Sequence, residues 1–249
     1  MMPQIDTSST DYPRGHVVGL HAHDAAQLVF ARSGVMRVIT EGGVWVVPPA
    51  RALWMPARTP HSVHCTTAVA MRSVFIRGEP ASAPPPRCTV ISVSPLMREI
   101  VVRLVEGPVT PEQSARLAAL LFDELQTLPV APLHLPEPQD SRLRRITAAL
   151  YEQPADRRSL EQWAREAGLS RRTLARRFAA ETGMSFGAWR RQLRFLTALE
   201  RLAEGTPVIH AALDAGYDSV SAFVHAFRRS LGVTPRRYFR DASALADRG

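Results

Sequence analysis

The sequence lacks lysine entirely, contains only two cysteines and has no long uninterrupted apolar run. Cys65 and Cys88 do not form a C-x-x-C pair, which argues against a disulfide framework and against a cysteine-based zinc site. No segment approaches the roughly 20 apolar residues needed to span a bilayer, so no membrane partner is expected. Because residues 1–13 also lack the basic start and the apolar stretch of a signal peptide, we expect a cytoplasmic protein.

Positive charge is concentrated at one end of the chain. All 31 basic residues are arginine, and they outweigh 23 acidic residues to give a net charge of +8 over 249 residues. Residues 1–140 hold 11 arginines and 12 acidic residues, whereas the last 109 hold 20 and 11. Proline shows the opposite bias, with 17 of 20 before residue 141. We therefore expect two chemically different domains, the second with an anionic partner such as nucleic acid.

The first 93 residues have the pattern of a β domain. Short apolar segments separated by glycine and proline predict an antiparallel sandwich or a small barrel. Residues 79–87, with three consecutive prolines, are expected to form a loop. The expected strands are Gln27–Ala31, Val35–Thr40, Val44–Val47, Ala52–Met55, Ser62–Thr66, Val69–Ile76 and Thr89–Val93.

Residues 94–128 change to a helical pattern. Apolar residues recur at spacings of three and four, which predicts two amphipathic helices. The residues concerned are Leu96, Ile100, Leu104, Leu117, Leu120, Leu121 and Leu125. They serve either core packing or dimerisation, and the sequence does not separate these roles. Residues 129–140 contain four prolines and are expected to be a linker.

The basic half contains an internal repeat. The segment Trp163–Ser170 is echoed by Ala211–Ser219, and both units have the pattern of helix, glycine turn, helix. The residues after these two segments match at an offset of 49: Leu174 with Phe223, Phe178 with Phe227, and Gly183 with Gly232. Phe186–Leu202 is expected to be one long connecting helix. Two helix-turn-helix units over residues 141–240 are therefore predicted.

Capping residues support these helix boundaries. Ser159 and Gln162 form a predicted capping box, and Thr206 is the predicted N-cap of a helix that starts at Pro207. Ser170 and Ser219 can cap the second helix of each unit. The helix starts are therefore specified by local chemistry as well as by periodicity.

A recognition helix must present polar and basic side chains opposite its apolar face. On a helical wheel, Leu174 and Phe178 face the core, as do Phe223 and Phe227. The candidate DNA contacts are Arg171, Arg172, Thr173, Arg176 and Arg177 in the first unit, and Ser219, Ser221, His225, Arg228 and Arg229 in the second. Of these we assign Arg171, Arg177, Arg228 and Arg229 mainly to phosphates.

The basic half resembles the paired helix-turn-helix domain of AraC/XylS-type bacterial regulators. The resemblance rests on Trp163–Phe186, on Gly216–Tyr217 and on the Gly232-x-x-Pro235-x-x-Tyr238 motif. It implies two helices that read adjacent major-groove segments of double-stranded DNA, and it implies a homodimer that can contact RNA polymerase. The implied base-reading positions are Arg172, Ala175, Arg176, Val220, Ser221, Val224 and His225. The valines would read thymine methyl groups.

Histidines give the β domain a second resemblance, to the cupins. His21, His23 and Gln27 have the spacing of the first cupin motif, and His61 ends a segment like the second, with Arg58 in place of its glycine. In cupins, two histidines of one strand and a third from a facing strand hold a divalent metal ion together with a carboxylate. Here Gln27 replaces that carboxylate, and glutamine is a weaker ligand.

Three interpretations of this cluster stay open: a divalent metal site, a metal-free pocket for a polar or anionic effector, and a polar cluster at the mouth of the barrel. His64 is expected to face away from the others. Trp45 and Trp54 could line an effector pocket, although core packing is favoured for both.

The sequence as a whole predicts an α+β chain of two domains: a cupin-like β-barrel followed by two helices, then an all-α double helix-turn-helix domain. We expect a transcription regulator that responds to a small-molecule or metal effector. The rival hypotheses are a cupin oxygenase or isomerase fused to a DNA-binding domain, and an architectural DNA binder without sequence preference.

Overall fold

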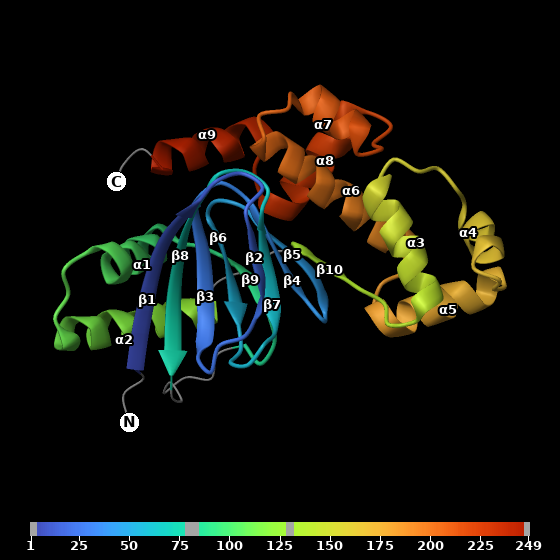
Figure 1. The fold of residues 1–249 in the computed structure, drawn as a ribbon. Helices are drawn as coiled ribbons and strands as arrows, with labels where there is room; N and C mark the ends of the chain where they lie inside the picture. Colours follow the sequence, from blue (N-terminus) through green and yellow to red (C-terminus); the bar gives the residue numbers. More distant parts are fainter. Residues whose placement is uncertain (1–3, 78–84, 128–131, 247–249) are drawn as a thin grey trace. The chain divides into compact units, whose positions relative to one another are not determined.

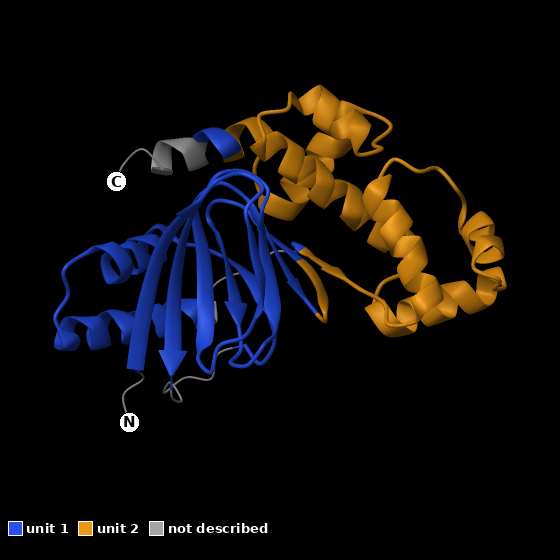
Figure 2. Cartoon of the chain, in the orientation of Figure 1, with its two compact units in different colours: residues 1–40, 45–133, 239–249 blue, residues 41–44, 134–238 orange. Residues whose placement is uncertain are grey.

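The computed structural model describes residues 4–77, 85–127 and 132–246 (Figure 1). They form two compact units: unit 1 comprises residues 1–40, 45–133 and 239–249, and unit 2 comprises residues 41–44 and 134–238 (Figure 2). Strands dominate the first part of the chain and helices the second, so the predicted α+β class is confirmed. None of the described helices combines the length and apolar character needed to cross a bilayer.

The strands form two five-stranded sheets, in the orders β1-β8-β3-β6-β9 and β10-β5-β4-β7-β2. Strands predicted from the sequence match β3 to β9 to within two residues at either end. The described strands therefore form two separate sheets rather than one closed barrel. The strands are β1 (Gln4–Tyr12), β2 (Val17–His21), β3 (Ala26–Ser33), β4 (Met36–Thr40), β5 (Gly43–Val47), β6 (Arg51–Met55), β7 (His61–Cys65), β8 (Val69–Arg77), β9 (Thr89–Ser92) and β10 (His134–Pro136).

Strands β1 and β2 were not predicted, and both lie at a sheet edge. β1 pairs with β8 over its whole length, from Gln4 opposite Arg77 to Tyr12 opposite Val69. Most of its side chains are polar, and all of them are half-buried or exposed. An edge strand pairs with only one neighbour and buries little of its surface. It therefore lacks the alternating apolar pattern by which strands are recognised in a sequence.

The expectation of a plain linker over residues 129–140 was incomplete. Residues 132–140 include strand β10, an edge strand beside β5, where proline is tolerated. The following residues are fixed to the helices of unit 2: the Trp189 indole donates to the Pro136 carbonyl at 2.7 Å. The backbone N–H groups of Gln139 and Asp140 donate to Glu181. Residues 129–131 lie outside the described part of the chain.

Two helices, α1 (Pro95–Glu106) and α2 (Pro111–Thr127), cover one face of the first sheet. The core between them includes Leu28, Trp54, Ile100, Leu121 and Leu125. Core packing is therefore established for most of the leucine pattern. By contrast, Leu96 and Leu120 are exposed. The expected dimerisation role of this helix pair stays a prediction.

The helices after the linker repeat as the sequence predicts. They are α3 (Ser141–Glu152), α4 (Leu160–Glu166), α5 (Arg171–Thr182), α6 (Phe186–Ala203), α7 (Val208–Asp214), α8 (Val220–Leu231) and α9 (Pro235–Ala246). Ser170 and Ser219 cap α5 and α8, and both helices end on a glycine in the left-handed conformation, Gly183 and Gly232. The Ser159 capping box is present at α4.

One predicted helix start was wrong. Helix α7 begins at Val208, with Pro207 as its N-cap residue and no side-chain cap, rather than at Pro207 with Thr206 as the cap. The predicted connecting helix is α6, whose buried residues include Trp189, Leu193 and Leu199. It contacts α5 of the first helix-turn-helix and α7 and α8 of the second.

Candidate DNA-binding surface and histidine site

Helix α5 buries one face and exposes arginines on the other. Leu174 and Phe178 are fully buried, and Phe178 packs edge-on against the Trp189 ring of α6. The outward side chains of Arg172 and Arg176 are exposed, as is Arg171. The wheel prediction for this helix is thus confirmed for its buried and exposed faces, whereas its DNA contacts stay a prediction.

Two predicted contacts of α5 have partners within the protein. The Thr173 hydroxyl lies 2.9 Å from the Ser170 hydroxyl at the helix cap. The Arg177 guanidinium donates to the Asp140 carboxylate at 2.8 Å. Asp140 also accepts hydrogen bonds from the side chain and backbone of Arg142, and together these donors hold the pKa of its carboxyl well below the usual range. Arg177 therefore has a structural role that the sequence did not reveal.

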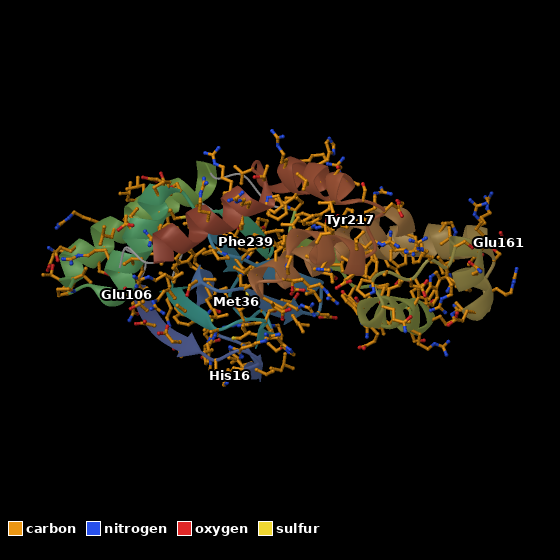
Figure 3. All side chains as sticks on the ribbon, turned by 90° about the horizontal axis from the view of Figure 1, so that it is seen from above. His16, Met36, Glu106, Glu161, Tyr217 and Phe239 are labelled. Atoms are coloured by element: carbon orange, nitrogen blue, oxygen red, sulfur yellow. The ribbon has the colours of Figure 1, made fainter. Side chains whose placement is uncertain are left out.

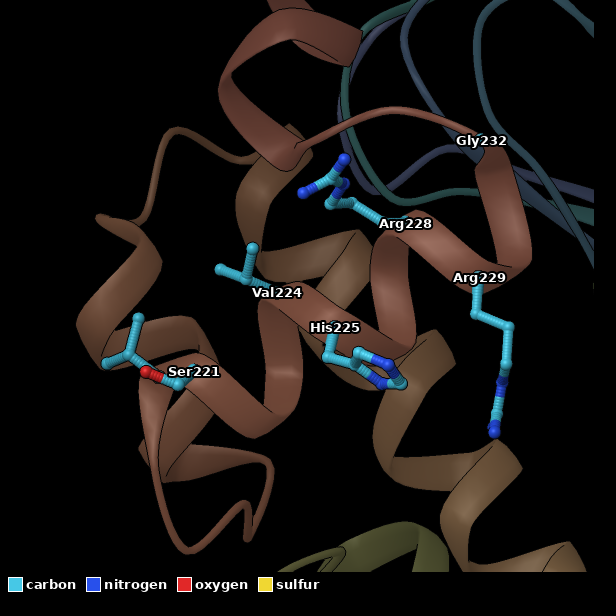
Figure 4. A pocket seen from close by; sticks show the side chains of 7 residues that line it. Ser221, Val224, His225, Arg228, Arg229 and Gly232 are labelled. Carbon is cyan, nitrogen blue, oxygen red and sulfur yellow. The ribbon is translucent and has the colours of Figure 1, made fainter.

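Helix α8 repeats the buried face with different outward residues. Phe223 and Phe227 are fully buried, and their rings contact each other edge to face. Ser219 is occupied as the helix cap, its hydroxyl accepting from the Ala222 N–H at 3.2 Å. Figure 4 shows the residues that line a pocket along α8: Val220, Ser221, Val224, His225, Arg228, Arg229 and Gly232.

The arginines of unit 2 divide into engaged and available side chains. Arg190 and Arg194 of α6 donate to backbone carbonyls of the loop between α3 and α4, at Arg158 and Pro154 respectively. Such arginines stabilise the fold and leave only part of the excess positive charge for a partner. Five arginines on α5 and α8 make no ion pair with any described residue: Arg171, Arg172, Arg176, Arg228 and Arg229.

The Gly216–Tyr217 motif has a packing explanation. Gly216 has a φ of +90°, and a Cβ there would lie 2.8 Å from the Cα of Ala155. Only glycine fits both the conformation and the space. Tyr217, labelled in Figure 3, packs against Phe223 with ring centroids 5.2 Å apart, and burial raises the pKa of its hydroxyl to about 12. The motif therefore shapes the turn before α8.

In unit 1 the structure brings His21, His23 and His61 together. One ring nitrogen from each lies within 4.8 Å of the others. His21 ends β2 and pairs in register with His61, the first residue of β7. His23 lies beyond the end of β2, so the expectation that both motif histidines share a strand was wrong; packing against Phe75, with centroids 4.8 Å apart, places its ring. His64 does not belong to the cluster.

Hydrogen bonds define the protonation of two of these rings. His21 Nδ1 lies 2.7 Å from the Gly19 carbonyl, and His61 Nδ1 lies 2.9 Å from the Thr59 carbonyl. A carbonyl only accepts, so Nδ1 carries the hydrogen and Nε2 the lone pair of each neutral ring. His61 is 2% exposed, and its Nε2 has no hydrogen-bond partner among the described residues.

The surroundings of His23 and of His61 favour the neutral imidazole. Burial lowers the pKa of His23 and of His61, and the neighbouring histidines lower both further; the Thr59 carbonyl opposes this at His61. Beside His23, a pocket is lined by Asp6, Ala22, Asp24, Ala25, Phe75 and Arg77. No sequence pattern pointed to Asp6 there, because β1 was not predicted.

Gln27, the fourth predicted ligand, is buried on β3. Its Nε2 donates to the Ser73 hydroxyl at 3.0 Å, and its Oε1 has no partner in the described structure. Trp54 points to the opposite face of the sheet from Gln27. It lies in the core under α1 and α2, and its indole N–H donates to the Pro85 carbonyl. We therefore assign Trp54 to packing rather than to a pocket. Trp45 is half-buried and donates to the Thr40 hydroxyl.

Two family models match the chain. An AraC-like ligand binding domain matches residues 3–169, and a helix-turn-helix domain matches residues 163–241. The chain is 36% identical over 222 residues to the HTH-type transcriptional regulator NimR of Escherichia coli, covering 88% of this chain and 81% of NimR. It is 27% identical to the regulator ExsA of Pseudomonas aeruginosa, covering 85% and 76%. A crystal structure of ToxT from Vibrio cholerae aligns with a TM-score of 0.41 at 11% identity, covering 96% of this chain and 99% of that one.

The paired helix-turn-helix motifs, the two family-model matches and the similarity to NimR define the class. This chain belongs to the AraC-type family of transcription regulators, with an N-terminal ligand-binding domain and a C-terminal DNA-binding domain.

Proposed function

We propose that this regulator reads a specific DNA sequence with α5 and α8, each in its own major-groove segment. One observation carries the proposal. Both helices have a serine N-cap, a left-handed glycine at the C-terminal end and two fully buried apolar residues, while arginines that make no ion pair with a described residue are exposed on the outside. Such a helix can enter the major groove without disturbing the core that holds it.

The residues of α5 suit hydrogen-bonded readout. Arg172 and Arg176 are four positions apart, so they project from the same face. An arginine can donate two parallel hydrogen bonds to O6 and N7 of guanine. Arg171 at the first turn is assigned to a phosphate. Arg177 is assigned a positioning role, because its ion pair with Asp140 joins α5 to the N-terminus of α3.

The residues of α8 suit a different kind of readout. Ser221 and His225 can hydrogen-bond to base edges, whereas Val220 and Val224 can contact only apolar groups, of which the thymine methyl is the one in the major groove. Arg228 and Arg229 lie in the last turn and are assigned to phosphates. We thus propose a guanine-containing segment under α5 and a thymine-containing segment under α8.

We further propose regulation by an effector rather than catalysis. NimR and ExsA are transcription regulators, and Gln27 stands where the cupin pattern has a carboxylate. An effector must bind two arrangements of the DNA-binding domains unequally, because equal affinity shifts no population. A homodimer, contact with RNA polymerase and a cytoplasmic location are proposed from family membership.

The test uses duplexes selected from a random library by the full-length protein. Arg172→Ala and Arg176→Ala are each expected to weaken binding to the selected site by about 1–3 kcal/mol in fluorescence anisotropy, with a smaller loss on non-specific DNA. The matched control is Arg116→Ala, which removes the same charge from an exposed position on α2. An equal loss on every duplex would contradict base readout by these arginines and assign them to phosphates.

A further inference from the structure

We propose that His21, His23 and His61 form a binding site for a divalent transition-metal ion, held through ring nitrogens with one coordination position open. The proposal deepens the proposed function by naming the chemistry of the sensor site. Three features of the described structure carry it: the tautomers of two of the rings, the buried nitrogen without a partner and the spacing of the three rings.

The ring orientation already has the form that metal-binding histidines need. The Gly19 and Thr59 carbonyls each accept from an Nδ1, so the Nε2 lone pairs of His21 and His61 are fixed and available. Metal-binding histidines usually donate their second nitrogen to a carbonyl or carboxylate in this way, which sets both tautomer and orientation. The backbone thus holds two ligands in position before any ion arrives.

The buried Nε2 of His61 has no hydrogen-bond partner among the described residues. A buried acceptor without a hydrogen bond is unfavourable and calls for a specific explanation. Gln27 Oε1 is a second buried acceptor in the same domain without a partner among the described residues. Both atoms offer lone pairs and neither offers a hydrogen, so each calls for a hydrogen-bond donor or a metal cation. A metal cation is the partner that all three rings of the cluster could share.

The spacing of the three rings is close to that of a metal site. Nitrogens bound to one tetrahedral zinc ion at 2.0–2.1 Å lie about 3.4 Å apart, and the candidate nitrogens lie within 4.8 Å of one another. The rings would have to turn towards one another to bind one ion, and His23, half-buried and outside the strands, is the one that we expect to move most. The pairing of His21 on β2 with His61 on β7 keeps these two rings close together.

The donor set indicates which ions fit. Imidazole nitrogens suit zinc, cobalt, nickel and copper, while magnesium and calcium prefer oxygen ligands. Three protein ligands leave a fourth position for water or a small molecule. The pocket beside His23 is lined by Asp6, whose carboxylate pairs with Arg77, and by Asp24, whose carboxylate pairs with Arg58. We expect the fourth, exchangeable ligand of the ion to face this pocket.

The experiment uses untagged full-length protein, since a polyhistidine tag would bind the same metals. The protein is stripped with a chelator, loaded with Zn²⁺ or Co²⁺, desalted and analysed by mass spectrometry for metal content and by absorption spectroscopy for the Co²⁺ ligand field. We expect one equivalent per chain and a Co²⁺ spectrum of nitrogen coordination. In His21→Ala, His23→Ala and His61→Ala, affinity should fall at least tenfold.

His64→Ala is the matched control, because His64 lies on the same strand as His61 and outside the cluster. It should retain full metal binding, and circular dichroism should show that all four variants fold. His23→Ala keeps the test decisive if His61→Ala does not fold, since His23 is half-buried and lies outside the strands. No stoichiometric binding, or equal loss in His64→Ala, would overturn the proposal. Site-specific DNA binding by the metal-free protein is scored separately, so failure here leaves DNA readout intact.

Discussion

The two recognition helices share a scaffold and differ in what they present. In both α5 and α8, a serine caps the first turn, a left-handed glycine ends the last, and two large apolar residues are fully buried. On the outside, Arg172 and Arg176 occupy the base-reading positions of α5, whereas valines, serine and histidine occupy those of α8. The scaffold fixes where each helix lies, and the exposed residues determine what it can read.

A second difference lies in how the two helix-turn-helix units are held. The first is fixed to the preceding segment through Arg177 and Asp140, and its first helix starts with a capping box. The second has no side-chain cap at α7. The first therefore has more local interactions, whereas the second depends more on packing against α6. Substitutions at matching positions of the two can break or sharpen this comparison.

The largest expected effect comes from the buried phenylalanines. Phe178→Ala and Phe227→Ala should each lower the free energy of unfolding by about 3–5 kcal/mol, because each leaves a cavity in a fully packed core. Chemical denaturation followed by circular dichroism measures this loss. Similar losses would show that the two scaffolds are equivalent; a loss below about 1 kcal/mol at one site would contradict equal packing.

The caps should have the next largest effect. Ser170→Ala and Ser219→Ala are each expected to cost about 0.5–2 kcal/mol of stability, because each leaves a backbone N–H of the first turn without its partner. Thr206→Ala is the control. The Thr206 hydroxyl does not cap α7, so its loss should change stability by no more than about 0.5 kcal/mol. A cost at Thr206 equal to that at Ser170 would contradict the observed start of α7.

These caps also show why the helical half was predictable from the sequence. Ser170, Ser219, Gly183 and Gly232 act on neighbouring residues, so their effect is written within a few positions of the chain. Thr206 shows the limit of such signals, because a cap and a proline can lie one position outside the helix they precede. The partner of Arg177 could not be predicted, since Asp140 is 37 residues away.

The β half was predictable where strands are buried. Strands β3 to β9 have apolar patterns, but β1 is specified by pairing with β8, whose paired residues come 57 to 73 positions later. The resemblance of two segments to the cupin motifs predicted a cluster of three histidines, and the structure brings them together. It did not predict the Nδ1 contacts with Gly19 and Thr59 or the ring of Phe75 beside His23, because these depend on turns and side-chain packing.

Thymine readout by α8 can be tested by removing one methyl group. Replacing thymine by uracil under α8 should weaken binding by about 0.8 kcal/mol, the value of one buried methyl-sized group, as measured by anisotropy. In Val224→Ala the same replacement should have less effect, because the contact is already reduced, and the double-mutant cycle isolates the pair. Uracil under α5 is the control. Equal losses under both helices would contradict the proposed difference between them.

The smallest expected effect concerns the phosphate contacts. Arg228→Ala and Arg229→Ala should each reduce the slope of log affinity against log salt by about 0.9, because each would eliminate one phosphate contact and the counterion it releases. Between 50 and 200 mM salt, this amounts to roughly a threefold difference in affinity for one contact. The loss should be alike on selected and non-specific duplexes, unlike that of Arg172→Ala. An unchanged slope would show that these exposed arginines of α8 do not reach the backbone of the DNA, and base readout by His225 and Val224 would then have to position this helix without them.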